Sequence, residues 1–399
     1  MSENEPCLLS TWPDDHGRWR CLRILRSIGN SMQPSRVLLG MVAATLLVIG
    51  GRTWDGVTTP AADGDELVVG IYEATQVSVQ QHLAEVVTAT VELRPHAAVL
   101  SILDVVVGIP ASLFAAGHTW FLVVYGIWIL IVASIVGGAI CRTAAVFTAT
   151  GEVMHPRVSL RYTRQRWGQF LGAVGIPLIV AGVLTGVLML FGLLFMSIPV
   201  IDLLGGVLYG AAVVIGLVLA FVLVGYLISG PMLLPAVAVE NCDGADAGQR
   251  AWSYVLAHPL TMLGYLLMTG LGLVFGAIVV AGMLFAAVAL TGALVSKGMV
   301  GSSLVPMVSD VPARSLWVWG VAEESATWHG QWTSGFIGFW LMVVRIIFAG
   351  WVISYLCTAA TDIYLLMRWK CDGQEPDEVW WPGMIEGTTD VAGPDHSST

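Results

Sequence analysis

Long apolar stretches alternate with polar segments along most of the chain. A helix that crosses a bilayer needs about 20 mostly apolar residues. The pattern predicts about six spans, over residues 37–51, 120–141, 170–196, 205–229, 260–294 and 336–367. Only a short turn around Pro199 and Asp202 separates the third span from the fourth. We therefore expect these two spans to form an antiparallel hairpin.

Two further stretches are less regular. Residues 97–115 are apolar but contain Asp104 and Pro110, so they are interpreted as a re-entrant or interfacial helix or as a seventh span. Residues 66–93 have the apolar spacing of an amphipathic helix. The first span is short, and Arg36 at its edge could lengthen it by snorkelling toward the headgroups. A cleaved signal peptide is the competing interpretation of that segment, and the long polar region before it disfavours this.

Composition supports a membrane location. The 399 residues are 56% hydrophobic and only 12% charged, whereas soluble domains average about 25% charged residues. Mean hydropathy is +0.78. So much apolar surface is stable where lipid is the solvent. We therefore expect an all-α fold, a polytopic transmembrane helix bundle with interfacial amphipathic helices.

The distribution of Lys and Arg predicts the orientation. Thirteen of the 18 basic residues lie in the N-terminal tail (1–36), in the segments after the second and fourth spans, or after residue 367. Basic residues favour the cytoplasmic side, so both termini are predicted there, in a bacterial cytoplasmic membrane. The membrane domain would then cover residues 37–368, with external segments at 52–118 and 295–335. Residues 369–399 form an acidic tail that we expect to be mostly disordered.

One arginine inside a predicted span is the main candidate site. Arg345 lies about 14 Å along the sixth span from Phe336, at 1.5 Å per residue. An ionisable group at that depth is costly unless it is paired or hydrated. Asp104 and Asp202 are its candidate partners. Asp362 lies near the inner end of the same span, where Arg368 or a helix terminus could pair with it. A structural ion pair or a snorkelling arginine explains the same residues without any site.

Basic residues also predict lipid contacts. Arg157, Arg161 and Arg164 are spaced by four and three residues, so they share one face of a helix over residues 156–168. Such a helix suits the surface of an anionic inner leaflet, and simple positive-inside anchoring explains it equally well. A second short helix is predicted over residues 243–257, capped by Asp243 or Asp246 and ended by Pro259.

Enzymatic chemistry has little support in the sequence. The eight histidines lack metal-binding spacing, the six cysteines form no CxxC pair, and Walker and GxSxG motifs are absent. We expect no metal, no cofactor and no catalytic residues. A net charge of −10 also disfavours nucleic acid as a partner. The expected partners are the lipid bilayer, anionic lipid headgroups, and either further copies of the chain or an envelope protein.

Three segments resemble recurrent elements of uncharacterised bacterial polytopic membrane proteins, at residues 137–167, 230–260 and 361–380. The second, GPMLLPAVAVENCDGADAGQRAWSYVLAHPL, is also distantly similar to the membrane domain of bacterial glycerophosphodiester phosphodiesterases. The catalytic barrel of those enzymes is absent from this chain, so the resemblance implies membrane architecture and not their activity. The favoured interpretation is a structural, assembly or envelope-interaction protein. The alternative is a transporter or channel-like protein with a polar path at Arg345.

Overall fold

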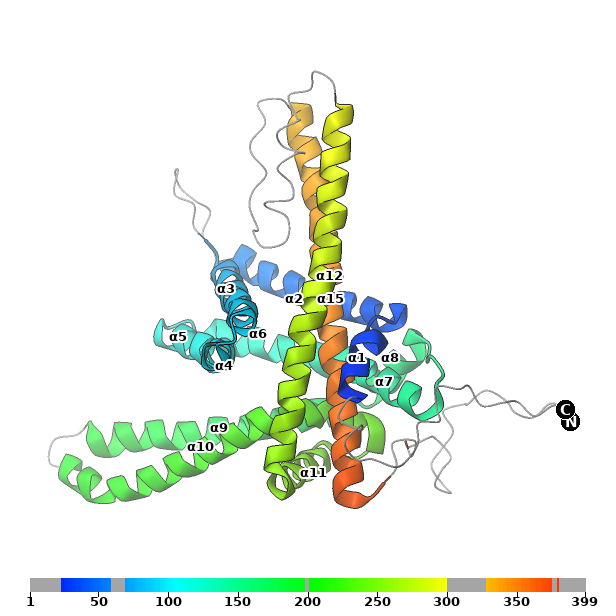
Figure 1. Ribbon diagram of the computed structural model, residues 1–399. Helices are drawn as coiled ribbons and strands as arrows, with labels where there is room; N and C mark the ends of the chain where they lie inside the picture. The colour runs from blue at the N-terminus through cyan, green and yellow to red at the C-terminus, as the bar shows by residue number, and fades with distance from the viewer. Residues whose placement is uncertain (1–22, 59–68, 198–200, 300–327, 375–378, 380–399) are drawn as a thin grey trace, which may run out of the picture.

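The computed structural model describes residues 23–58, 69–197, 201–299, 328–374 and 379, and within these ranges all regular structure is helical (Figure 1). The helices in chain order are α1 (Arg23–Ser31), α2 (Pro34–Thr58), α3 (Ile71–Val91), α4 (Pro95–Leu103), the π-helical turn η2 (Asp104–Gly108), α5 (Ile109–Ala115), α6 (Thr119–Val132), η3 (Ala133–Gly137), α7 (Gly138–Thr150), α8 (Pro156–Gln165), α9 (Trp167–Phe191), η4 (Gly192–Met196), α10 (Ile201–Glu240), α11 (Gly244–Ala257), α12 (Pro259–Gly298) and α15 (Trp328–Asp372).

Seven helical runs in the described part of the chain are long and apolar enough to cross a membrane. They are Pro34–Thr58, Pro95–Ala115, Thr119–Thr150, Trp167–Met196, Asp202–Glu240, Pro259–Gly298 and Trp332–Asp372. The prediction of an all-α, polytopic membrane protein is therefore confirmed, with six to seven spans. The additional run is the stretch around residues 97–115, whose helix continues through the π-helical turn η2.

Most helices extend beyond the segments that hydropathy outlines. The 40 residues of α12 measure about 60 Å at 1.5 Å per residue, and a bilayer's hydrocarbon core is about 30 Å thick. α10 continues through Pro231 and Pro235 to Glu240. Hydropathy marks the part of a helix that suits lipid, whereas the helix itself ends only where its backbone or its packing does.

The antiparallel hairpin predicted from the short turn near Pro199 is present. α9 and η4 pack along α10 (Figure 1). Few residues of this hairpin are buried away from the junction, and only 6% of the most apolar window of each helix is buried. Leu, Val and Ile side chains cover its surface, with Val207 77% exposed. Such a surface requires lipid or other membrane helices around it.

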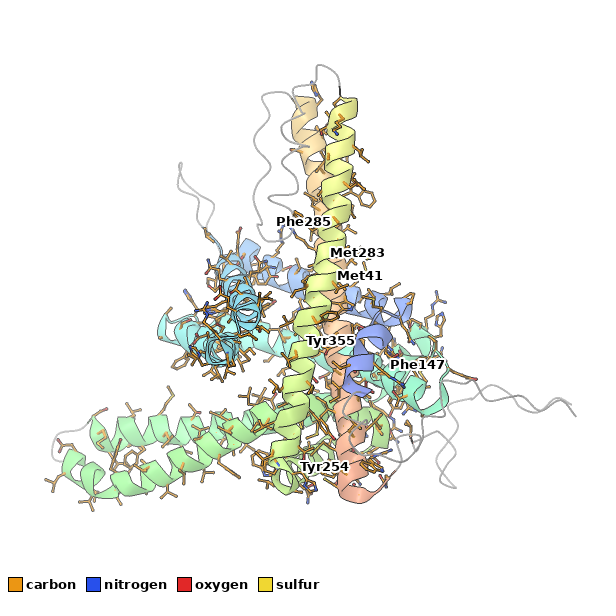
Figure 2. The ribbon with its side chains drawn as sticks, in the orientation of Figure 1. Met41, Phe147, Tyr254, Met283, Phe285 and Tyr355 are labelled. Carbon is orange, nitrogen blue, oxygen red and sulfur yellow. The ribbon has the colours of Figure 1, made fainter. Side chains whose placement is uncertain are left out.

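A second long pair consists of α12 and α15, which lie side by side and leave the centre of the molecule in a different direction from α9 and α10 (Figure 1). Gly272 and Gly276 of α12 allow the close approach, because a Cβ on either would collide with Tyr355 or Trp351 of α15. Met283 and Phe285 project from the distal part of α12 (Figure 2).

The best-packed region is where the helices converge. We call it the junction: α1, α7, α8, α11, residues 34–44 of α2, residues 229–240 of α10 and residues 350–372 of α15. Its core includes the fully buried residues Ile24, Met232, Tyr364 and Met367, and Phe170 at the start of α9 packs against them. Both predicted short helices belong to it, as α8 and α11. The junction therefore joins one end of the α9–α10 hairpin to one end of the α12–α15 pair.

The segments predicted at 66–93 and 243–257 are helical as expected, at Ile71–Val91 and Gly244–Ala257. Asp243 precedes α11 as its N-cap residue, but its side chain instead accepts a hydrogen bond from Gln169 at 3.3 Å. The polar start of the N-terminal tail, most of the segment 295–335 and the tail after residue 379 lie outside the described residues.

Candidate functional site

The junction contains a set of buried charged side chains, and Arg36 is the first. It is 1% exposed, so its side chain does not extend to the headgroups by snorkelling, which the sequence had allowed. Its guanidinium donates to the carbonyl oxygens of Asn30 (2.9 Å) and Thr143 (3.4 Å) and lies 5.0 Å from the centre of the Phe147 ring. Asn30 belongs to the last turn of α1, where carbonyls lack partners within the helix. Arg36 therefore ties the end of α1 to α7.

The other carbonyls at the end of α1 are satisfied too. The Ser31 hydroxyl donates to the Ile28 carbonyl, the Met32 N–H donates to Gly29, and the Ser354 hydroxyl of α15 donates to Ser31 at 2.8 Å. A buried helix end without such partners would cost several kcal/mol. The complete pairing shows that α1 has a defined place against α2 and α15.

Arg142 binds the C-terminal end of α10, as Arg36 binds the C-terminal end of α1. The sequence placed it in a connecting loop, but it lies within α7 and is 2% exposed. It donates to the carbonyl oxygen of Ala238 at 2.7 Å, in the last turn of α10. There the guanidinium also faces the negative end of the helix dipole. Asn241, with φ +58°, then ends α10 in the left-handed region that favours Asn or Gly.

An aromatic ring joins this arginine to α8. Tyr162 lies between Arg142 and Arg166, at 4.7 and 5.6 Å from ring centre to guanidinium carbon. Its hydroxyl donates to the Asn241 side chain at 3.2 Å. Burial raises the pKa of Tyr162, and the two arginines oppose that rise. The phenol therefore stays neutral and links α7, α8 and α10.

Glu240 is the centre of the ionic network at the end of α10. It accepts a hydrogen bond from Arg368 at 2.6 Å and one from the Tyr364 hydroxyl at 3.4 Å, and it lies 3.8 Å from Arg250. Arg368 is 2% exposed. The sequence alone does not point to Glu240, because nothing within α10 or α11 indicates that α15 supplies the buried arginine.

Neighbouring contacts extend this network along α11 and α15. The Tyr254 hydroxyl donates to the Asp372 carboxylate. Burial, followed by this hydrogen bond, raises the pKa of Tyr254. Lys370 donates to the Thr261 hydroxyl at 2.6 Å. These contacts fix the C-terminal end of α15 against α11 and the start of α12.

Asp362 contacts α1. The Ser27 hydroxyl of α1 donates to Asp362 at 2.6 Å, and the carboxylate is 2% exposed. Arg368, one of the two partners that the sequence offers for Asp362, pairs with Glu240. Asp362 thus holds α1 against α15, which fits a structural role.

The structure does not bring the Arg345 candidates together. Arg345 lies half-buried on α15. Asp202 is in the first turn of α10, at the far end of the α9–α10 hairpin from α15 (Figure 1). Asp104 begins η2 and is exposed. Within the described ranges, neither Asp104 nor Asp202 pairs with Arg345, and the role of Arg345 in a polar path stays a prediction.

The arginines of α8 are arranged as the spacing predicts. Arg157, Arg161 and Arg164 are all exposed, whereas Ser159 and Thr163 on the other side of the helix are buried. α8 therefore presents a basic face outward and packs against α7 and η3 with its small hydroxyl residues.

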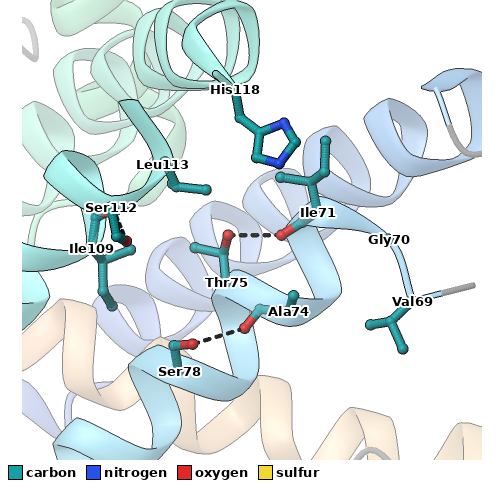
Figure 3. A pocket seen from close by; sticks show the side chains of 10 residues that line it. All are labelled: Val69, Gly70, Ile71, Ala74, Thr75, Ser78, Ile109, Ser112, Leu113 and His118. Atoms are coloured by element: carbon teal, nitrogen blue, oxygen red, sulfur yellow. Dashed lines mark hydrogen bonds between the residues drawn. The ribbon is translucent and has the colours of Figure 1, made fainter. Parts of the chain in front are cut away.

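A pocket of about 270 Å³ lies between α3 and α5 (Figure 3). Its hydroxyl groups are engaged within their own helices: Thr75 donates to the Ile71 carbonyl, Ser78 to Ala74 and Ser112 to Ile109. His118 is the only titratable side chain in its lining. The pocket is therefore lined by apolar side chains, three hydroxyl groups and one imidazole.

Metal chemistry has no support in the described residues, since no group of three His, Cys, Asp or Glu side chains there could hold an ion. A comparison of the chain with protein-family models, curated proteins and solved structures finds no match. The resemblance of the three segments to bacterial membrane proteins therefore stays a prediction.

Proposed function

We propose that this protein is a structural or assembly component of a bacterial cytoplasmic membrane, with both termini on the cytoplasmic side, and that it is not an enzyme. One observation carries the proposal. The buried charged groups of the junction are used to hold helices together: Arg36 and Arg142 bind helix ends, Arg368 binds Glu240, and Asp362 binds Ser27.

Buried charges that hold helices together suit a structural role. A catalytic acid or base needs to reach a substrate, whereas these side chains are occupied by protein groups and buried. The junction fixes the positions at which the apolar hairpins begin. The hairpins in turn expose long apolar faces. The junction thus forms a packed base from which apolar helices project. This arrangement suits a protein that assembles with a partner within the bilayer.

Small residues support α9 and α10 as the surface for that partner. Gly182, Gly186, Gly206 and Gly210 form two GxxxG pairs, and a Cβ built on any of them would meet no atom within 4 Å. Open small-residue faces permit close helix–helix approach in membranes. The proposed partner is a second copy of the chain or another envelope protein.

Site-specific photo-crosslinking in intact cells tests the assembly role. A crosslinker at Val207 or Leu217, both exposed on α10, should give one defined protein adduct. The same group at Met232, which is buried in the junction, should not. Mass spectrometry of the adduct identifies the partner. If only lipid adducts form at several exposed positions of α9 and α10, the assembly role is rejected.

The half-burial of Arg345 within a candidate span supports the transport alternative, because a charge at that position is costly without a polar environment. Purified protein in liposomes would then conduct an ion or a solute. Arg345→Ala should abolish the flux, and Arg345→Lys should retain part of it. Flux that is equal in all three proteins would show that Arg345 lines no path.

A further inference from the structure

The basic face of α8 is a second surface feature, distinct from the apolar hairpins. On a helix with 3.6 residues per turn, Arg157, Arg161 and Arg164 fall within an arc of about 60°. The buried Ser159 and Thr163 lie on roughly the opposite side. The arginine face is therefore directed away from the protein by the same packing that anchors the helix.

These arginines are available to a ligand. In the part of the chain that the structure describes, no hydrogen bond or ion pair engages the three guanidinium groups. The nearest acidic residue in sequence is Glu152, which is exposed and precedes the helix. Arg166, the next basic residue, is engaged with Tyr162 and Gln169 instead. Among the residues that the structure describes, no acidic side chain pairs with these three positive charges.

The surroundings of α8 indicate a bilayer as the partner. Val158 and Trp167, both 53% exposed, flank the arginines. Trp167 is also the first residue of α9, which is a candidate span. Tryptophan prefers the headgroup level of a membrane. A helix that joins directly to a span at such a residue lies close to the membrane surface.

We propose that α8 is a binding site for acidic phospholipids, with Arg157, Arg161 and Arg164 contacting the headgroup phosphates. Arginine binds phosphate oxygens through paired N–H donors, and Val158 and Trp167 enter the acyl boundary. The proposal rests on the membrane location proposed above. It adds a lipid specificity that an assembly role does not require.

Lipid titration of the purified protein tests it. Phosphatidylglycerol is added to the full-length protein in neutral detergent, and the melting temperature is followed. Ligands that bind the folded state stabilise it. We expect stabilisation by phosphatidylglycerol, little by phosphatidylcholine, and a weaker effect in high salt. Each arginine should contribute about fivefold in affinity. Arg157→Gln, Arg161→Gln and Arg164→Gln together should raise the half-effective lipid concentration about 100-fold.

Two matched variants separate charge from fold. Arg52→Gln, Arg94→Gln and Lys297→Gln remove the same charge from residues predicted on the other side of the membrane, and should leave the titration unchanged. Replacing the three α8 arginines by lysine should retain most of the affinity. An unchanged titration in the triple glutamine variant overturns the proposal, as does equal stabilisation by glycerol phosphate alone. Carbonate extraction reports membrane insertion separately. A negative lipid titration therefore rejects the lipid site and leaves the proposed function intact.

Discussion

Gly40 of α2 and Gly350 of α15 meet backbone to backbone where the two helices cross. A Cβ on Gly40 would overlap the Gly350 carbonyl group, and a Cβ on Gly350 would lie 2.6 Å from the Met41 nitrogen. Rotating a side chain relieves neither position, because main-chain atoms lie within 3 Å of each added Cβ. The contact sets the distance between α2 and α15 at the edge of the junction.

Gly350→Ala should therefore destabilise the protein. Inserting a methyl group into a close-packed interface costs about 1–3 kcal/mol, and a rigid backbone on the other side favours the upper end. The measurement is the melting temperature in detergent. Gly338→Ala is the control, because that glycine lies on the same helix, is exposed, and has no atom within 4 Å of an added Cβ. An alanine there should be neutral or slightly stabilising. Equal effects at both positions would contradict the close crossing.

The Glu240–Arg368 pair predicts a larger effect from loss of one partner. Glu240→Gln removes the charge that compensates a nearly fully buried guanidinium. Breaking a buried pair in this way costs about 3–5 kcal/mol. Replacing both partners, as in Glu240→Gln with Arg368→Met, should recover part of that loss, because no buried charge then stays unpaired.

The control for this pair is Arg94–Glu92, in which both side chains are 56% exposed. Glu92→Gln should change stability by no more than about 1 kcal/mol. The comparison uses the same chemical change at both positions. A result in which the exposed and buried pairs matter equally would show that burial of Arg368 is not what makes Glu240 important.

Much of the fold follows from the sequence, because lipid requires continuous apolar helices. The α9–α10 hairpin was predictable since the turn around Pro199 is too short for any other arrangement. α8 and α11 were predictable from their prolines and charge spacing. The ends of the long helices were not. Arg142 illustrates why: hydropathy ends the span before it, whereas the helix continues to Thr150 because another helix accepts the charge.

The candidate site shows the same limit. Arg345 was conspicuous because it interrupts an apolar run, which a sequence displays directly. Glu240 and Arg368 are 128 residues apart and become partners only through packing of α10 on α15. No local spacing could reveal that pairing. Asp362 is a candidate from the sequence, but Ser27, whose hydroxyl donates to it, lies on a helix that hydropathy does not mark.

Arg142 gives a test of helix capping inside the junction. Arg142→Met keeps the length of the side chain and removes the donor to the Ala238 carbonyl oxygen. Hydrogen bonds from charged groups contribute about 1.5–3 kcal/mol, so stability should fall by that amount. Arg142→Lys should restore part of it. Hydrogen exchange of the last turn of α10 should increase in the methionine variant. Unchanged exchange there would show that Arg142 does not hold that helix end.

Cys242, between α10 and α11, gives a prediction about pH. Burial raises the pKa of its thiol to about 11, and nearby Arg250 only partly opposes this. The thiol also donates to the Ala236 carbonyl oxygen at 3.8 Å. Thiolate is the reactive form of cysteine. With the pKa raised by about two, the thiolate fraction near neutral pH is about 100-fold smaller than in an ordinary cysteine.

A variant with Cys242 as its only cysteine should thus react slowly with maleimide in the folded state. The rate should rise about tenfold per pH unit up to pH 10, without levelling. In denaturing detergent the same thiol should level near pH 9. Since the folded pKa is raised, the stabilising effect of the neutral thiol is complete below pH 9 and is lost as the pH approaches 11. A folded-state rate that levels near pH 9 would show that the thiol is not protected by the packing of α10 against α11.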